Sequence, residues 1–172
     1  MKLTKFSDFS LRLLIYVAVK HPENSSIGEI GQSFDMSPAH LKKIVGELGR
    51  QGYLISMRGR GGGIRLGRDP GQINIGDLVR FTERNLAIVE CFQAGGSSCR
   101  IEPSCQLKGV LREATDEFFA VLHRYTLADL VRPRRQLRRQ SPRRPPGEAE
   151  SDHRAPEHRA PEHRAPAQRS RG

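Results

Sequence analysis

The sequence predicts a mainly α-helical protein with a small β-wing: a winged helix-turn-helix domain followed by a long dimerisation helix, in a homodimer. Three observations support this fold class. A Ser-Pro helix start follows a short helical segment, a glycine-rich run separates two short apolar runs, and a later stretch has apolar residues at spacings of three and four. At 172 residues, the chain has room for one such domain and an appendage.

Two helices are expected before the turn. From Asp8 to about His21 apolar residues occur on most sides, so this segment is expected to be a buried central helix. Ser26 is a suitable N-cap for a short second helix, whose apolar residues are spaced along one face as far as Phe34.

A third helix and a hairpin complete the expected winged domain. Ser37 is a good N-cap and Pro38 stands at the favoured first helical position, so a helix is expected to start here and to stop at Gly52. Tyr53–Met57 and Ile64–Leu66 are predicted to be short strands, because the glycine-rich segment between them suits the tip of a hairpin.

The later helices are expected to leave an apolar surface. Asn74 is expected to cap a helix over Ile75–Arg84, and a last helical turn at 126–131 is expected to precede Pro133, where the ordered part ends. Between them, a long amphipathic helix has more apolar surface than so small a domain can cover, so part of it is expected to pack against a second copy. Its apolar stripe consists of Leu107, Val110, Leu111, Ala114, Phe118, Val121, Leu122 and Tyr125.

Four segments are therefore expected along the chain. They are a winged helix-turn-helix domain at 1–85, a cysteine loop at 86–106, the dimerisation helix with its last turn at 107–131, and a disordered basic tail at 132–172. The tail holds 12 Lys+Arg against 5 Asp+Glu and only one large aliphatic residue, so it has too little apolar surface to order itself. A soluble tail and a weak, unspecific attraction to nucleic acid both explain its HRAPE repeat and its charge.

The third helix and the wing are the most basic part of the expected domain. Between His40 and Arg68 there are seven Lys+Arg and one acidic residue, Glu47. The pattern predicts binding to a double-stranded DNA operator, with a solvated basic face as the alternative. A phosphate-binding loop is not expected, since the glycines lie between two strands and no Lys-Ser/Thr pair follows. The predicted DNA-binding residues are Ser37, Ala39, His40, Lys42, Lys43, Arg58, Arg60 and Arg65.

All three cysteines fall within fifteen residues, at Cys91, Cys99 and Cys105, with glycine, serine and proline between them. Three thiolates at one site suit an iron–sulfur cluster; structural zinc, a thiol switch and buried structural thiols are the alternatives. An odd cysteine count favours a reducing compartment. The first apolar run is interrupted by Asp8 and Arg12 and is too short to cross a membrane, so we expect a cytoplasmic protein.

Six segments together resemble the Rrf2 family of winged-helix regulators, and within it the nitric-oxide-sensing repressors. They are MKLTKFSDFSLRLLIYVA, SPAHLKKIVGEL, RGRGGGIRLG, INIGDLVR, the three cysteines and TLADLV, which span nearly all of residues 1–131. The resemblance implies a homodimer in which a cysteine loop separates the winged domain from the dimerisation helix. It also implies a protein that is not an enzyme.

The same resemblance implies a cluster and its ligands. Cys91, Cys99 and Cys105 would bind the iron of a [4Fe-4S] cluster, with Asp8 of the other subunit as the fourth ligand; a [2Fe-2S] cluster is the alternative. An ordinary acidic residue at the start of the first helix would also explain Asp8. The family's iron–sulfur biogenesis regulators have a histidine three residues after the last cysteine. Lys108 stands there, which argues against that subgroup.

The expected function is a DNA-binding repressor that senses nitric oxide through its cluster and derepresses nitrosative-stress genes. An iron- or redox-sensing regulator on the same scaffold is the first alternative. A DNA-binding module that ignores its cysteines is the second. A thiol-based enzyme is less well supported, since no base is positioned to activate a nucleophile.

Overall fold

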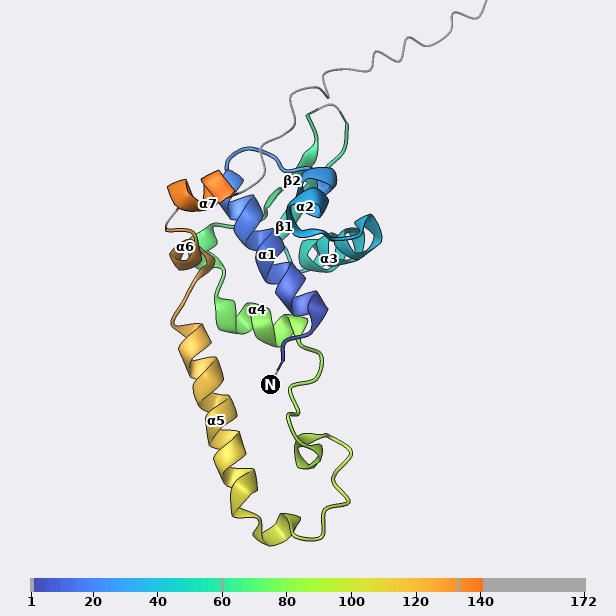
Figure 1. Ribbon diagram of the computed structural model, residues 1–172, viewed down its shortest axis with the longest axis vertical. Helices are drawn as coiled ribbons and strands as arrows, with labels where there is room; N and C mark the ends of the chain where they lie inside the picture. Colours follow the sequence, from blue (N-terminus) through green and yellow to red (C-terminus); the bar gives the residue numbers. More distant parts are fainter. Residues whose placement is uncertain (1, 60, 133, 141–172) are drawn as a thin grey trace, which may run out of the picture.

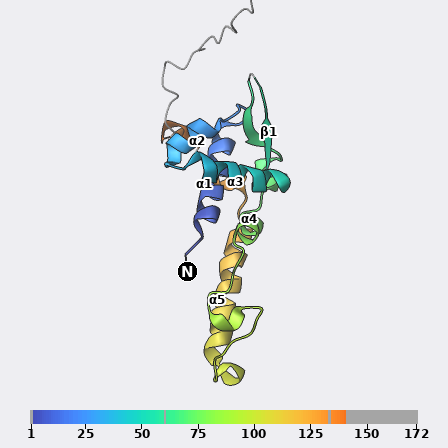
Figure 2. The same ribbon diagram turned by 90° about the vertical axis from the view of Figure 1, so that its right-hand side faces the viewer.

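The structure is a computed structural model that describes residues 2–59, 61–132 and 134–140. A group of short helices and a hairpin forms one end, and a long helix with the cysteine loop beside it extends away as an arm (Figures 1 and 2). The helices are α1 (Lys5–Lys20), α2 (Ile27–Phe34), α3 (Pro38–Arg50), α4 (Ile75–Thr82), α5 (Gln106–His123), α6 (Leu127–Leu130) and α7 (Arg134–Gln140). The strands are β1 (Leu54–Met57) and β2 (Gly63–Leu66), and short 3-10 turns are η1 (Pro70–Gln72), η2 (Glu90–Phe92) and η3 (Glu102–Ser104).

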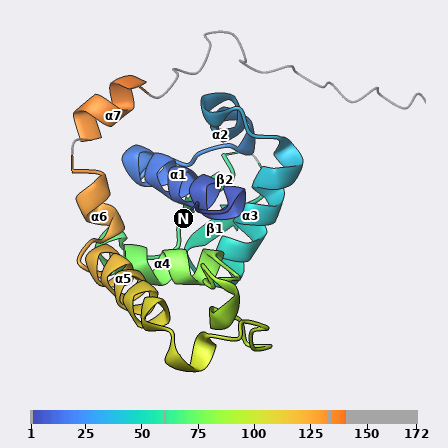
Figure 3. The same cartoon turned by 60° about the horizontal axis from the view of Figure 1, so that its bottom comes forward.

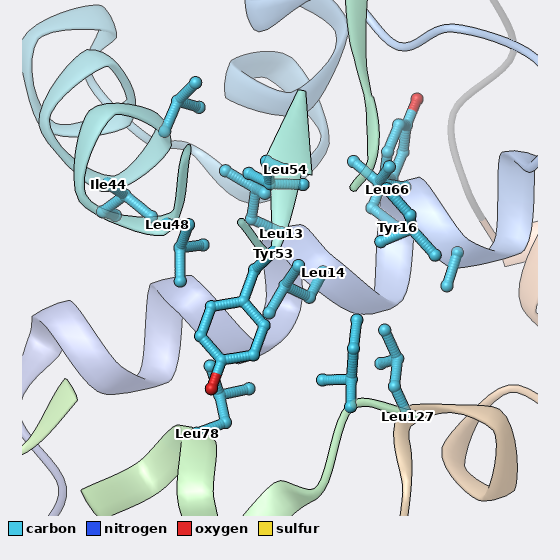
Figure 4. Packing of buried hydrophobic residues seen from close by; sticks show 14 of the residues in the cluster. Leu13, Leu14, Tyr16, Ile44, Leu48, Tyr53, Leu54, Leu66, Leu78 and Leu127 are labelled. Atoms are coloured by element: carbon cyan, nitrogen blue, oxygen red, sulfur yellow. The ribbon is translucent and has the colours of Figure 1, made fainter. Parts of the chain in front are cut away.

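Helix α1 is the centre of the winged domain, as predicted. Leu13 and Leu14 are fully buried, and the close view in Figure 4 shows them between the side chains of α3, α4 and the wing. The helix starts three residues earlier than expected, because Thr4 rather than Asp8 begins it: the Thr4 hydroxyl accepts a hydrogen bond from the Ser7 N–H.

The helix-turn-helix is confirmed. Ser26 and Glu29 form a capping box at the start of α2, and Asp35 takes a left-handed conformation at its end, with φ of 51°. The turn is tight, because a Cβ at Gly31 would lie 3.1 Å from the Met36 carbonyl oxygen. Ser37 then caps α3, whose last helical residue is Arg50.

The wing is a two-stranded antiparallel sheet in which Leu54 pairs with Leu66 and Met57 with Gly63. Both strands occur where the sequence predicts them, shifted by one residue at their starts. The loop between α1 and α2 adds one bridge to the inner strand, between Ser25 and Ile64. This bridge ties β2 to the loop that follows the central helix.

The long helix α5 packs on α4 near its C-terminal end only. Phe119 is its one buried residue, and the Arg80 guanidinium lies 4.0 Å from the centre of that ring. Much of the predicted stripe is exposed: Leu107 by 61%, Val110 by 59%, Val121 by 43% and Tyr125 by 48%. Within the described part of one chain, these apolar side chains have no core to enter.

The prediction that order ends at Pro133 is wrong for the next residues. Arg134–Gln140 form α7, which lies against the C-terminal end of α1 (Figure 3). Its contact is polar: Arg138 Nε donates to the Val19 carbonyl oxygen over 3.3 Å, and Arg138 Nη2 lies 2.7 Å from Glu23 Oε1. The sequence of α7 has no apolar stripe, and Arg138 connects this helix to the C-terminal end of α1 by a hydrogen bond. The expectation for 141–172 lies outside the described residues. In the described ranges, no helix is both long enough and apolar enough to cross a bilayer.

Candidate DNA-binding surface and cysteine loop

Helix α3 has one buried face and one basic exposed face. Leu41, Ile44 and Leu48 are buried in the core. The other side of the helix is exposed, and it contains every α3 residue that the sequence predicts to contact DNA: Ala39, His40, Lys42 and Lys43. A helix held by one face can present its opposite face, with its first turn leading, to a groove of DNA.

Two of the predicted residues in this region have contacts within the protein. The Ser37 hydroxyl accepts a hydrogen bond from the His40 N–H over 3.3 Å and therefore caps the N-terminus of α3. The His40 ring meets the Phe9 ring edge-on, with 6.4 Å between the ring centres. Phe9 follows Asp8 in α1, so the first turn of α3 touches the segment that contains the predicted fourth ligand.

The wing exposes the other predicted arginines that the structure describes. Arg58 and Arg65 are exposed, and Arg60 lies outside the described residues. Glycines on either side of the tip take positive φ values, 90° at Gly59 and 78° at Gly61, which a tight turn of this kind requires.

Two arginines counted in the basic excess are used within the fold instead. Arg68 donates to the carbonyl oxygens of Gln51 and Gly52, and its guanidinium lies 4.4 Å from the centre of the Tyr53 ring. Arg50 pairs with Glu47 over 2.8 Å. The charge count along the sequence therefore overstates the basic surface, since side chains at the end of α3 are already neutralised or engaged.

The cysteine loop leaves α4 and returns at the start of α5. Cys91 lies in η2, Cys99 is exposed between the two short 3-10 turns, and Cys105 directly precedes α5. All three thiols are free. The hydrogen bonds in the loop are local: the Cys99 N–H donates to the Ser97 hydroxyl, and the Ser98 N–H donates to Glu90. Such a loop has few contacts that hold it in one shape.

The structure brings two of the three thiols to one hollow. Cys99 and Cys105 line it together with Lys108 and Arg112, while Cys91 lines a neighbouring hollow that shares Arg112. Within the described ranges, no three side chains of His, Cys, Asp or Glu lie close enough together to hold a metal ion. A cluster would require the loop to bring Cys91 to the other two.

The chemistry of this donor set suits an iron–sulfur cluster. Thiolate ligands and the sulfides of a cluster are anionic, and Lys108 and Arg112 stand beside two of the three thiols. Cys105 lies at the N-terminus of the 18-residue α5, where the helix dipole stabilises negative charge. The hollow therefore combines soft ligands with two cationic side chains, one of which, Lys108, is paired with the Glu102 carboxylate in the same hollow.

Lys108 is engaged with a carboxylate. Its ammonium donates to Glu102 over 2.6 Å, and this hydrogen bond is the main cause that lowers the pKa of Glu102. A protonated lysine in an ion pair has no lone pair for iron. Lys108, which stands where the biogenesis regulators have a histidine, is thus unsuited to metal binding.

Asp8 lies in the first turn of α1 and is partly exposed. Its Oδ1 accepts a hydrogen bond from Arg12 Nε over 2.9 Å, and the two side chains are exposed by 42% and 50%. The ion pair between Arg12 and Asp8 was not predicted, although an acid–base pair four residues apart on a helix is a recognisable signal. As the fourth cluster ligand, Asp8 would have to contact the cysteine loop of a second subunit, and the structure describes a single chain.

The buried α1, the helix-turn-helix and the hairpin wing define a class: the molecule is a winged helix-turn-helix DNA-binding protein. The sequence model of the Rrf2 family, described as "Iron-dependent Transcriptional regulator", matches residues 3–133. The chain belongs to this family. It is a transcriptional regulator and not an enzyme.

Several relatives share most of this chain. The "HTH-type transcriptional regulator NsrR" of Bacillus subtilis (strain 168) is 50% identical over 138 residues, which cover 80% of this chain and 94% of the relative. A protein of the same name from Geobacillus kaustophilus (strain HTA426) is 47% identical over 139 residues, covering 80% and 95%. The chain is therefore an NsrR-like regulator of the Rrf2 family.

Solved structures share the fold. The structure titled "Crystal structure of Staphylococcus aureus CymR oxidized form" has a TM-score of 0.63 at 28% identity, covering 77% of this chain and 97% of that one. "The Structure of CymR (YrzC) the Global Cysteine Regulator of B. subtilis" has a TM-score of 0.59 at 30% identity, covering 76% and 95%. "T. potens IscR" has a TM-score of 0.62 at 22% identity, covering 77% and 88%, and supports the fold alone.

Proposed function

We propose that this chain is a homodimeric repressor that releases its operator when nitric oxide reacts with an iron–sulfur cluster held by Cys91, Cys99 and Cys105. The observation that carries the proposal is the set of three free thiols in one short loop, beside Lys108, Arg112 and the N-terminus of α5. The 50% identity to a regulator named NsrR supports the same function.

The exposed stripe of α5 supports the homodimer. Leu107, Val110 and Val121 are each exposed by more than 40% in the single chain. Beside them, Leu86, Leu111 and Phe118 help to line a hollow of about 450 Å³ between α5 and the segment that follows α4. Apolar surface of this extent on one helix favours association with a second copy.

In the proposed dimer, Asp8 of one subunit completes the ligand set of the other. Its carboxylate is accessible on the first turn of α1, and it would exchange its ion pair with Arg12 for a bond to iron. When bound, a [4Fe-4S] cluster supplies iron that a small ligand such as nitric oxide can attack, most readily where the weakest ligand is a hard carboxylate. A [2Fe-2S] cluster is the alternative.

The chain's own contacts offer a route from this ligand to DNA. Phe9 follows Asp8 and meets the His40 ring at the start of α3, the predicted recognition helix. If Asp8 moves, α1 and α3 are expected to shift relative to the partner's copies. Two recognition helices must be spaced for half-sites roughly 34 Å apart, so such a shift weakens operator binding. A coupling of about 1–3 kcal/mol would change the affinity about 5–150-fold.

Anaerobic purification of the full chain tests the proposal. Iron and sulfide analysis should give about four irons per subunit for a [4Fe-4S] cluster, with a visible absorption band that nitric oxide changes. Operator binding should fall on the same addition of nitric oxide. A colourless anaerobic protein, or operator binding that ignores nitric oxide, would contradict the proposal.

The Asp8→Ala variant tests the fourth ligand. The expected protein is a folded dimer whose cluster is lost faster in air, and Glu117→Ala, which removes an exposed acid from α5, is the matched control. Equal cluster lifetimes in Asp8→Ala and the control would remove Asp8 from the ligand set.

A second candidate is a regulator that binds DNA without a cluster. The observation in its favour is that the described residues do not gather the three thiols by themselves. Operator binding that stays unchanged after all three cysteines are replaced by serine, with and without nitric oxide, would favour it. An iron- or redox-responsive regulator would bind the cluster and respond to iron supply or oxidant instead.

A further inference from the structure

The loop between α1 and α2 contacts both the wing and the C-terminal helix. Asn24 Nδ2 donates to the Gly61 carbonyl oxygen over 2.9 Å, next to the tip of the wing. At β2, the Ser25 N–H donates to the Ile64 carbonyl oxygen and the Ile64 N–H donates to the Ser25 carbonyl oxygen, over 2.9 and 2.7 Å. The loop therefore contacts the hairpin at two points, one beside the tip and one in β2.

The contact between this loop and β2 is close-packed. A Cβ at Gly63, where φ is 144°, would lie 2.9 Å from the Ser25 carbonyl oxygen and 3.1 Å from Asn24 Cβ. Ser25 itself is fully buried. Because this junction is close-packed, a displacement of the loop moves the wing with it.

The same loop is held from the other side by α7. Glu23 Oε1 lies 2.7 Å from Arg138 Nη2, and Arg138 Nε donates to the carbonyl oxygen of Val19, in the last turn of α1. One side chain of α7 therefore connects the end of α1 to the loop. The adjacent residue of that loop, Asn24, holds the wing.

We propose that Arg138, Glu23 and Asn24 are positioning residues for DNA binding. Helix α7 braces the α1–α2 loop through Arg138, and the loop sets the position of the wing relative to α3. The winged domain is thereby stiffened by a segment that follows the dimerisation helix. This inference rests on the proposed use of the wing at the operator, and the test below separates the two.

Operator affinity of the full chain is the first measurement. Asn24→Ala should weaken binding about three- to tenfold, because it removes the hydrogen bond nearest the wing tip. Arg138→Gln and Glu23→Gln should each weaken binding about two- to fivefold, since an exposed ion pair contributes little. The combination of Arg138→Gln with Glu23→Gln should bind no more weakly than Arg138→Gln alone, because that single change already removes both contacts of Arg138.

A charge exchange distinguishes the brace from a direct contact of Arg138 with DNA. The double variant Arg138→Glu with Glu23→Arg keeps the net charge and can remake the pair, so the brace predicts that it recovers most of the affinity lost by Arg138→Glu alone. A phosphate contact predicts no recovery, full affinity in Glu23→Gln and a salt dependence lowered by about one unit in Arg138→Gln. That result would overturn the inference.

Hydrogen exchange of the free protein provides the second measurement. The brace predicts faster exchange at the Ser25 and Ile64 amides in Arg138→Gln, with the melting temperature unchanged. Unchanged exchange overturns the brace whatever the operator does. Faster exchange with normal operator affinity supports the brace and contradicts the use of the wing in operator binding.

Discussion

The winged domain and the arm formed by the cysteine loop and α5 differ in what stabilises them. In the winged domain, α1, α3, α4 and both strands share one buried core, and each of its longer helices begins at a side-chain cap. In the arm, α5 has one buried residue and its N-cap, Cys105, makes no capping hydrogen bond. The first region is complete in one chain. The second has surfaces and thiols that suit a partner and a cluster.

The largest expected effect concerns the core of the winged domain. Leu14→Ala should lower the free energy of unfolding by about 2–5 kcal/mol, because Leu14 is fully buried and its removal leaves a cavity. Denaturant unfolding of the full chain measures this change. Glu117→Ala, at an exposed polar position of α5 outside the apolar stripe, is the control, and an equal loss there would contradict the difference between the two regions.

The next effect concerns the arm. Leu107→Asp should dissociate the proposed dimer and leave the winged domain folded, because a charge would replace an apolar side chain that is 61% exposed in one chain. Sedimentation velocity should show at least roughly a tenfold weaker association, equivalent to about 1.4 kcal/mol. Glu113→Gln, also exposed on α5, should leave association unchanged. A Leu107→Asp protein that remains fully dimeric would place the interface elsewhere.

The joint between the two regions can be tested at a glycine. A Cβ at Gly76 in α4 would lie 2.6 Å from the His123 ring of α5, which also contacts the Phe119 carbonyl oxygen and Asp77. Gly76→Ala should therefore destabilise the protein by about 1–3 kcal/mol through overpacking.

Gly109→Ala is the matched control for that joint. Among the described residues, no atom apart from the neighbouring helix backbone lies within 4 Å of a Cβ placed at Gly109, so alanine should stabilise α5 by up to about 1 kcal/mol through helix propensity. Thermal unfolding of both variants compares them. Equal effects of the two substitutions would contradict the packing of α5 on α4.

The smallest effect concerns pH. Burial raises the pKa of Tyr53, beside Arg68 in the winged domain. The unfolded tyrosine ionises near pH 10, so the stability from neutral Tyr53 is fully present below that pH and is lost as pH rises through the folded value. Tyr53→Phe should flatten the decline of stability above about pH 10. Tyr125→Phe, in the arm, controls for the loss of one tyrosine, and parallel declines in all three proteins would contradict the prediction.

Local signals in the sequence were sufficient for the elements of the winged domain. Ser26, Ser37 and Asn74 cap the helices that they were predicted to begin, and Thr126 begins α6 through a capping box. The family could also be recognised from short motifs, and the match over residues 3–133 confirms it. The cluster, its ligand set and the DNA-contacting residues stay predictions.

Other features depended on contacts between residues far apart in the chain. Arg68 lies in the basic stretch of the sequence, yet it binds the end of α3 and the Tyr53 ring. Arg138 lies in a segment with almost no apolar residues, yet it holds the loop between α1 and α2 across 115 positions. No periodicity or composition could reveal either contact.

Local signals in the sequence were enough to predict most helices and both strands to within a few residues, the apolar side of each predicted helix, and the gathering of three thiols in one loop. These properties are local: they depend on residues a few positions apart, through caps, glycines and spacing. The burial of Phe119 and the exposure of Val110 followed from the packing of the folded chain, as did the set of arginines on the surface and the return of α7 to α1. These features depend on contacts between segments far apart in the sequence. In a close-packed fold, each such contact depends on the packing of the other segments as well.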